Sequence, residues 1–210
     1  MSELIQMTKV YIIESPSKED VEANRNEGGA LGKTLELATI KNKVFTVANV
    51  EEFKEALVEI AIEVEEIKAE LGAVHLHFSM HGSEDGVTLT DGTFINWQEF
   101  YEIIKEFNDN IGYIELPSGL KIAPTYLSFS VCKGFSATAI KDIGEESPYT
   151  ALIGPTESVE WADSLLAFSI FFHNVILKKT GTATALKNMN ETVGLDNVFQ
   201  ADGGKGMVIK

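Results

Sequence analysis

Short apolar runs alternate with longer amphipathic segments along this chain of 210 residues. Five runs are rich in valine, isoleucine, leucine or phenylalanine, as buried strands are: residues 10–13, 44–47, 74–80, 126–131 and 150–153. Residues 49–71 instead carry apolar side chains at helical spacing, namely Phe53, Leu57, Ile60, Val64, Ile67 and Leu71. This alternation predicts an α/β fold in which helices cover both faces of a mainly parallel sheet of about six strands.

Local signals mark where several elements begin and end. Asn49 with Glu52, and Asn96 with Glu99, have the spacing of helix-capping boxes. Asp91-Gly92, within residues 86–95, predicts the turn of a hairpin. A long apolar helix is expected over 163–179, another helix over 183–189 and a last strand over 207–209. No internal repeat or second boundary is visible, so residues 1–210 are expected to form a single domain.

Composition and charge narrow the function classes. The chain has 32 acidic and 17 basic residues, and its formal net charge of -15 argues against a nucleic-acid partner. The apolar run 165–177 is short for a membrane span, and the N-terminus lacks a signal-peptide pattern, so no membrane partner is expected. The one cysteine excludes an intrachain disulfide and suits a reducing compartment, so the expected location is cytoplasmic.

Two predicted strands end in residues with catalytic chemistry. Residues 74–80 lead into His81-Gly82, and residues 126–131 lead into Cys132-Lys133-Gly134. The carboxyl ends of parallel strands lie at one edge of a sheet, so the cysteine and this histidine are expected to meet there. A helix starting near Ser136 would lower the pKa of the thiol, and glycines would let backbone amides approach a substrate carbonyl. The pattern predicts a nucleophile, a base and an oxyanion hole in one cleft.

A hydrophobic block ending in His-Gly, followed by one ending in Cys-basic-Gly, resembles the caspases and their relatives, which include metacaspases, legumain, gingipain and CHAT-type bacterial proteins. His81 and Cys132 are 51 residues apart, close to the spacing of about 50 in caspases. The resemblance extends from Val10 to about Leu177. It implies a caspase-like three-layer sandwich and a cysteine endopeptidase that acts on protein or peptide substrates.

The resemblance also implies roles for these residues. Cys132 would attack the peptide carbonyl, His81 would protonate the leaving amine, and the amides of Gly82 and Cys132 would hold the oxyanion. No third catalytic residue is nominated, and no metal or organic cofactor is expected. Small bacterial relatives often serve as regulated effectors, so an activating partner protein or ligand is a further expectation. Only nine residues, 141–149, separate the cysteine block from the fifth strand, which predicts activity without obligatory cleavage.

Five residues are candidates for substrate binding. Trp161 resembles the tryptophan that shapes the caspase substrate groove. Arg25 resembles the arginine that grips an acidic side chain at P1, the residue before the scissile bond, although a structural salt bridge explains it equally well. Ser130 stands where caspases carry glutamine. Glu157 and Asp163, which cluster with Glu160, could instead receive a basic P1 side chain, as in metacaspases. Acidic and basic P1 preferences therefore both stay open.

Three other interpretations compete with the peptidase. His75, His77 and His81 invite a metal site, but His75 and His81 would lie roughly 20 Å apart along a strand, so packing roles are favoured for His75 and His77. A catalytically inactive caspase-like interaction module is the main alternative function, disfavoured because the cysteine and histidine are both present. An amidotransferase-like hydrolase would place its cysteine between two glycines, and residues 130–134 have glycine on one side only.

Overall fold

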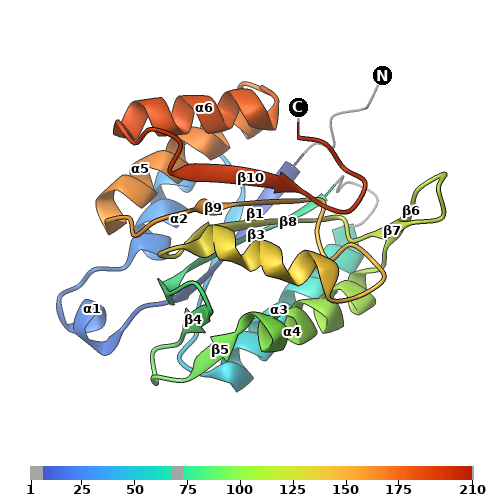
Figure 1. The fold of residues 1–210 in the computed structure, drawn as a ribbon. Coiled ribbons are helices and arrows are strands. Elements are labelled where there is room, and N and C mark those ends of the chain that lie inside the picture. Colours follow the sequence, from blue (N-terminus) through green and yellow to red (C-terminus); the bar gives the residue numbers. More distant parts are fainter. Residues whose placement is uncertain (1–6, 68–72, 210) are drawn as a thin grey trace.

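Six strands form the central path of the sheet, in the spatial order β10-β9-β8-β3-β1-β2 (Figure 1). The computed structural model describes residues 7–67 and 73–209. The bounds of these strands are β1 Met7–Ser15, β2 Asn42–Thr46, β3 Ala73–Gly82, β8 Thr125–Ser130, β9 Ala151–Pro155 and β10 Phe199–Gly203. Each neighbouring pair is parallel except β9 and β10, which are antiparallel. The α/β fold with a mainly parallel sheet is confirmed.

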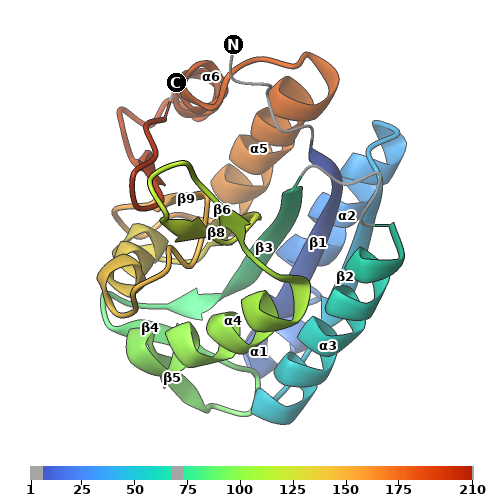
Figure 2. The same cartoon turned by 90° about the vertical axis from the view of Figure 1, so that its right-hand side faces the viewer.

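Helices cover both faces of this sheet (Figures 1 and 2). On one face lie α3 (Val50–Ile67) and α4 (Trp97–Ile111), which pack Phe53 and Phe100 against Phe78 of β3. On the other face lie α2 (Glu27–Leu37), α5 (Trp161–Phe172) and α6 (Thr182–Val193), in the cluster that contains Phe168 and Phe171. The strands between them are buried on both sides, which explains why their sequences are nearly continuous apolar runs.

Short elements complete the described chain. The helix α1 (Lys18–Glu22) follows β1, and the strands β4 (Gly86–Thr88) and β5 (Phe94–Asn96) form the predicted hairpin beside β3. Gly92 has φ +92° in the hairpin turn, a conformation that favours glycine. A second hairpin, β6 (Ile114–Glu115) with β7 (Lys121–Ile122), was not predicted. None of the helices in the described ranges is long and apolar enough to cross a membrane.

Two predictions in the C-terminal half, the last strand and the helix over 163–179, are wrong in detail. The last strand is β10 rather than 207–209, because the ring of Phe199 packs on that of Phe168 at a 5.6 Å centroid distance, whereas Val208 is 79% exposed. The helix expected near Ser136 is present as a 3₁₀-helix, Gly134–Asp142 (η1).

The predicted helix 163–179 begins at Trp161, and its last part is a π-helix instead of an α-helix. It is α5 followed by a π-helix, His173–Leu177 (η2). Asn174 Nδ2 donates to Ile170 O at 2.8 Å, so a side chain competes for a carbonyl that a regular helix would use.

The capping box at the start of α4 forms as predicted. At the start of α3, Asn49 Oδ1 accepts from Glu52 N–H as predicted, but Glu52 Oε2 accepts from Ala48 N–H instead of Asn49 N–H. Leu71, predicted at the end of the α3 stripe, lies outside the described residues.

Candidate active site

His81 and Cys132 follow two neighbouring strands of the sheet. β3 and β8 run parallel and pair as far as Ser79 and Ser130, so each residue lies two positions beyond a paired one. The structure therefore brings the histidine and the cysteine together at the carboxyl edge of the sheet, where functional groups of such sheets usually lie.

Gly82, directly after the histidine, lies against the end of the second strand. A Cβ at this position would be 2.3 Å from Val131 Cγ1 and 2.9 Å from Gly86 O. Any larger residue would have to push the two strand ends apart. The absence of a side chain at Gly82 is what lets the His81 and Cys132 segments approach each other this closely.

The two amides expected in the oxyanion hole have suitable surroundings. Ser83 N–H donates to Gly86 O at 2.9 Å, and hydrogen-bonded pairs alternate along antiparallel strands. The facing pair Gly82–Val87 is therefore non-hydrogen-bonded, and the Gly82 N–H points away from β4. The Cys132 N–H has no acceptor within residues 7–67 and 73–209. Neither the Gly82 N–H nor the Cys132 N–H donates a hydrogen bond to β4, so both can donate to a substrate oxygen.

A cavity of about 230 Å³ opens beside these residues. The ring of Trp161 meets the imidazole of His81 edge-on, with the ring centroids 5.3 Å apart and the planes at 78°. Cys132 Sγ is half-buried and lies 4.0 Å from Val159 O. The residues that line the cavity come from the ends of β3 and β8 and from the segment that enters α5: Met80, His81, Ser130, Val131, Cys132, Ser158, Val159, Glu160, Trp161 and Ser164.

Asp20 holds the imidazole from the other side. Its Oδ2 lies 2.5 Å from His81 Nε2 and accepts a hydrogen bond from Ser17 Oγ at 2.6 Å. Its Oδ1 accepts from Arg25 Nε at 2.9 Å. Because Nε2 is engaged, Nδ1 is the ring nitrogen that remains for proton transfer. The arrangement is an imidazole oriented by a carboxylate, which is the usual support of a general base.

The local sequence explains how Asp20 reaches this place. Ser15-Pro16 ends β1, which neighbours β3, and Ser17 then caps α1 by accepting a hydrogen bond from Asp20 N at 3.1 Å. Sequence reasoning missed this residue. The signal was a Ser-x-x-Asp capping pattern directly after the carboxyl end of a strand beside the histidine strand.

Asp20 is only 2% exposed, yet it stays suited to carrying charge. Burial alone would raise the pKa of this carboxyl, but hydrogen bonds from Ser17, His81 and Arg25 outweigh that effect and hold the pKa well below its ordinary value. A charged carboxylate next to Nε2 stabilises the imidazolium that forms when His81 takes up a proton.

The predicted substrate-binding residues divide into two groups. Trp161 and Ser130 line the cavity. Arg25, Glu157 and Asp163 do not belong to its lining, and Arg25 is instead bound to Asp20 through an ion pair, the second of the two roles considered for it.

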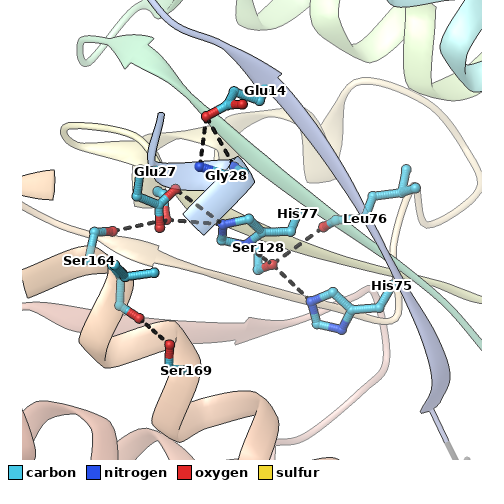
Figure 3. A network of polar contacts seen from close by, with 12 residues as sticks. Glu14, Glu27, Gly28, His75, Leu76, His77, Ser128, Ser164 and Ser169 are labelled. Atoms are coloured by element: carbon cyan, nitrogen blue, oxygen red, sulfur yellow. Dashed lines mark hydrogen bonds and ion pairs between the residues drawn. The ribbon is translucent and has the colours of Figure 1, made fainter. Parts of the chain in front are cut away.

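A buried polar network lies beneath the cavity floor (Figure 3). Ser128 Oγ lies 2.8 Å from both His75 Nε2 and His77 Nδ1, so the two histidines have a polar partner as well as aromatic packing. Burial lowers the pKa of His75 well below its ordinary value, and the neighbouring His77 lowers it further. No group of three or more histidine, cysteine, aspartate or glutamate side chains in the described parts of the chain is arranged to hold a metal ion.

Two buried glutamates flank this network. Glu14 Oε1 accepts from Gly28 N–H at 2.8 Å and from Gly29 N–H at 3.3 Å, and so caps the start of α2. Burial raises the pKa of Glu14; the two amides oppose this shift and Glu27 adds to it. Glu27, the first residue of α2, reaches the underside of the cavity through Ser130.

Several solved structures share this fold and are distant in sequence. No protein-family model and no curated protein matches the sequence. A secreted C11 cysteine protease from Bacteroides thetaiotaomicron, solved with an irreversible peptide inhibitor, superposes with a TM-score of 0.54 at 7% identity over 89% of this chain and 58% of the protease. The complex of the pro- and mature domains of Porphyromonas gingivalis RgpB gives a TM-score of 0.54 at 11% identity over 97% of this chain and 49% of the other.

The Arg-specific cysteine proteinase gingipain R gives a TM-score of 0.55 at 11% identity, again over 97% of this chain and 48% of the proteinase. The chain thus spans about half of the length of these neighbours. At such low identity the likeness concerns the fold. By that fold, the chain is a structural neighbour of the caspase-like cysteine proteases of clan CD.

Proposed function

We propose that this chain is a cysteine endopeptidase that hydrolyses peptide bonds in protein or peptide substrates. Cys132 is the nucleophile, His81 the general acid and base, and Asp20 the residue that orients the imidazole. The observation that carries the proposal is the contact between His81 Nε2 and the buried Asp20, beside a cavity that His81 and Cys132 both line.

The first half of the reaction forms an acyl-enzyme. His81 Nδ1 takes the proton of the Cys132 thiol. Cys132 Sγ then attacks the carbonyl carbon, and the electron pair of the C=O bond moves to oxygen, where the amides of Gly82 and Cys132 donate hydrogen bonds to it. His81 then gives the Nδ1 proton to the leaving nitrogen. The C–N bond breaks, the amine departs and a thioester remains on Cys132.

The second half releases the acid. A water molecule passes a proton to His81 Nδ1 and attacks the thioester carbonyl. The C–S bond breaks, the carboxylic acid leaves, and the thiol–imidazole pair is restored. Asp20 stabilises the imidazolium form through Nε2 in both halves, so its contribution is expected in kcat.

The proposal includes a regulated effector role in the cytoplasm, controlled by a partner protein or ligand rather than by obligatory cleavage. The short segment 141–149 supports this part of the proposal. The inactive interaction module remains the alternative, and a complete set of nucleophile, histidine and orienting carboxylate argues against it.

A fluorogenic peptide library varied at P1 tests the function. We expect the wild type to hydrolyse part of the library and both Cys132→Ala and His81→Ala to lose that activity. His173→Ala is the matched control, because this histidine lies in η2 and does not line the cavity. Activity that persists in Cys132→Ala, or a wild type that cleaves no peptide, would overturn the proposal.

A further inference from the structure

Two short segments carry the amides expected in the oxyanion hole: the histidine segment, residues 81–86, and the cysteine segment, residues 131–134. The strands that lead into them stop pairing at Ser79 and Ser130. No backbone hydrogen bond in the described parts of the chain joins the two segments. The close contact at Gly82 limits how near the segments can come, but it does not stop them from moving apart. The spacing between their amides therefore depends on other contacts.

An ion pair between exposed side chains joins the two segments. Lys133 Nζ donates to Glu84 Oε1 at 2.5 Å, across 49 positions of the chain. Within residues 7–67 and 73–209, no other hydrogen bond or ion pair connects the histidine segment to the cysteine segment. The hydrogen bond and the charge of Lys133 lower the pKa of Glu84, and the same contact raises the pKa of Lys133. Both groups therefore stay charged around neutral pH.

The backbone that carries Glu84 is held by the start of α4. Trp97 Nε1 donates to Glu84 O at 2.7 Å, and Trp97 N–H donates to Asp85 O at 3.1 Å. The indole is buried and packs edge-on against the ring of Phe129 in β8, with the centroids 6.0 Å apart. The Glu84 carboxylate is thus attached to an anchored backbone, two residues after Gly82.

The backbone that carries Lys133 is fixed as well. Its N–H donates to Glu157 O at 3.0 Å, and its C=O accepts from Ser136 N–H at 2.9 Å. Lys133 has φ +56°, a left-handed conformation that a non-glycine residue keeps only where its surroundings hold it. Because both backbones are anchored, the contact between the two side chains also restricts the distance between the neighbouring amides.

We propose that Glu84 and Lys133 are positioning residues for the oxyanion hole, and that their ion pair keeps the Gly82 and Cys132 amides at the spacing that the oxyanion requires. The inference rests on the proposed peptidase function. Such donors act only at hydrogen-bond distance from the place that the oxyanion will occupy, so a small displacement weakens them. Neither Glu84 nor Lys133 lines the cavity, so the effect is expected in kcat and not in KM. An exposed ion pair adds little to the free energy of unfolding, so the Tm should change little.

Steady-state hydrolysis of the best library peptide tests the pair. Glu84→Ala and Lys133→Met should each lower kcat about three- to tenfold, which is less than the loss of about 100-fold or more for removing an oxyanion donor. The double variant should be no slower than the single variants, because each change already breaks the same contact. Lys133→Arg keeps the charge and should retain kcat, and Glu84→Lys combined with Lys133→Glu should recover most of it.

The ion pair between Lys105 and Asp109 supplies the matched control. Lys105 Nζ lies 2.6 Å from Asp109 Oδ2, and the side chains of Lys105 and Lys133 are both 39% exposed. The control pair lies within one helix, α4, and joins no two segments of the site. Lys105→Met should therefore keep the wild-type kcat.

Two reagents separate the oxyanion hole from the nucleophile. With the aldehyde of the same peptide, Cys132 Sγ bonds to the carbonyl carbon, and the carbonyl oxygen takes up the charge and then a proton. This oxygen uses the two amides, so Lys133→Met should raise the inhibition constant about three- to tenfold. Iodoacetamide alkylates the same sulfur with loss of iodide and forms no oxyanion, so its rate should not change.

Several outcomes would overturn the inference. They are an unchanged kcat in both single variants, additive losses in the double variant, an equal loss in Lys105→Met, or a slower alkylation that matches the loss in kcat. A wild type that hydrolyses no peptide would instead remove the peptidase function itself.

Discussion

Replacing Asp20 with asparagine tests how the proposed catalytic imidazole of His81 is held, because the change keeps the size of the side chain and removes its charge. The carboxylate accepts hydrogen bonds from Ser17, Arg25 and His81 at 2.6, 2.9 and 2.5 Å. Hydrogen bonds to charged groups contribute about 1.5–3 kcal/mol each. If the His81 contact alone is weakened in the transition state, a tenfold change for every ~1.4 kcal/mol gives a loss in kcat of about 10- to 100-fold.

The assay is steady-state hydrolysis of the best library peptide across a range of pH. Asp20→Asn should lower kcat with little change in KM, because Asp20 does not line the substrate cavity. Asp91→Asn is the control, since the side chain of that aspartate accepts hydrogen bonds from the hairpin residue Thr93 and lies outside the cavity lining. Unchanged kcat and an unchanged pH profile in Asp20→Asn would refute the orienting role.

The same variant carries a stability prediction with a definite sign. The pKa of Asp20 is depressed by its hydrogen-bond partners in the folded state, so its charge stabilises the fold above the ordinary aspartate pKa of 3.8. This stabilisation is lost as the pH falls below that value. The difference in Tm between wild type and Asp20→Asn should therefore be largest near neutral pH and shrink at pH 3. A difference that grows on acidification would contradict the assigned direction.

Two further substitutions follow from the geometry. Gly82→Ala should lower the free energy of unfolding by about 1–3 kcal/mol and also reduce activity, because the added Cβ would lie 2.3 Å from Val131 Cγ1. Chemical denaturation measures the loss of stability, and an unchanged denaturation midpoint would contradict the close approach of the two segments. Glu14→Gln should be at least as stable as the wild type at pH 8. The raised pKa means that charging Glu14 costs stability as the pH rises through its folded-state value, so the advantage of the variant should fade toward pH 5, and a Tm series records it.

Much of the architecture follows from local patterns. The buried strands are continuous apolar runs, and the side-chain caps at Asn49 and Asn96 and the Asp91-Gly92 turn form where their residues predict them. These signals depend on residues only a few positions apart in the chain, so they can be recognised without the tertiary structure. The last strand could not be predicted from such local signals. Residues 199–203 are weakly apolar, but they pair with β9 because Phe199 packs beside Phe168, which lies 31 positions earlier in the chain.

The proposed catalytic pair was also visible in the sequence, because parallel strands bring their carboxyl ends to one edge whatever the details of packing. The partners of His81 and Cys132 were not visible in this way. Asp20 lies 61 positions from His81, and Glu27 lies 103 positions from Ser130. Such contacts depend on where the loop after β1 and the start of α2 pack.

The sequence by itself determined the layered α/β fold and the two strand ends that carry a thiol and an imidazole, because periodicity and strand order encode them. Only the tertiary structure decided which ring nitrogen is held, which carboxylate lies beneath the cavity and which ion pair joins the segments that carry His81 and Cys132. The physical reason is that a hydrogen-bond direction belongs to a set of neighbours in space, and those neighbours come from β1, α1, α2, β8 and α5.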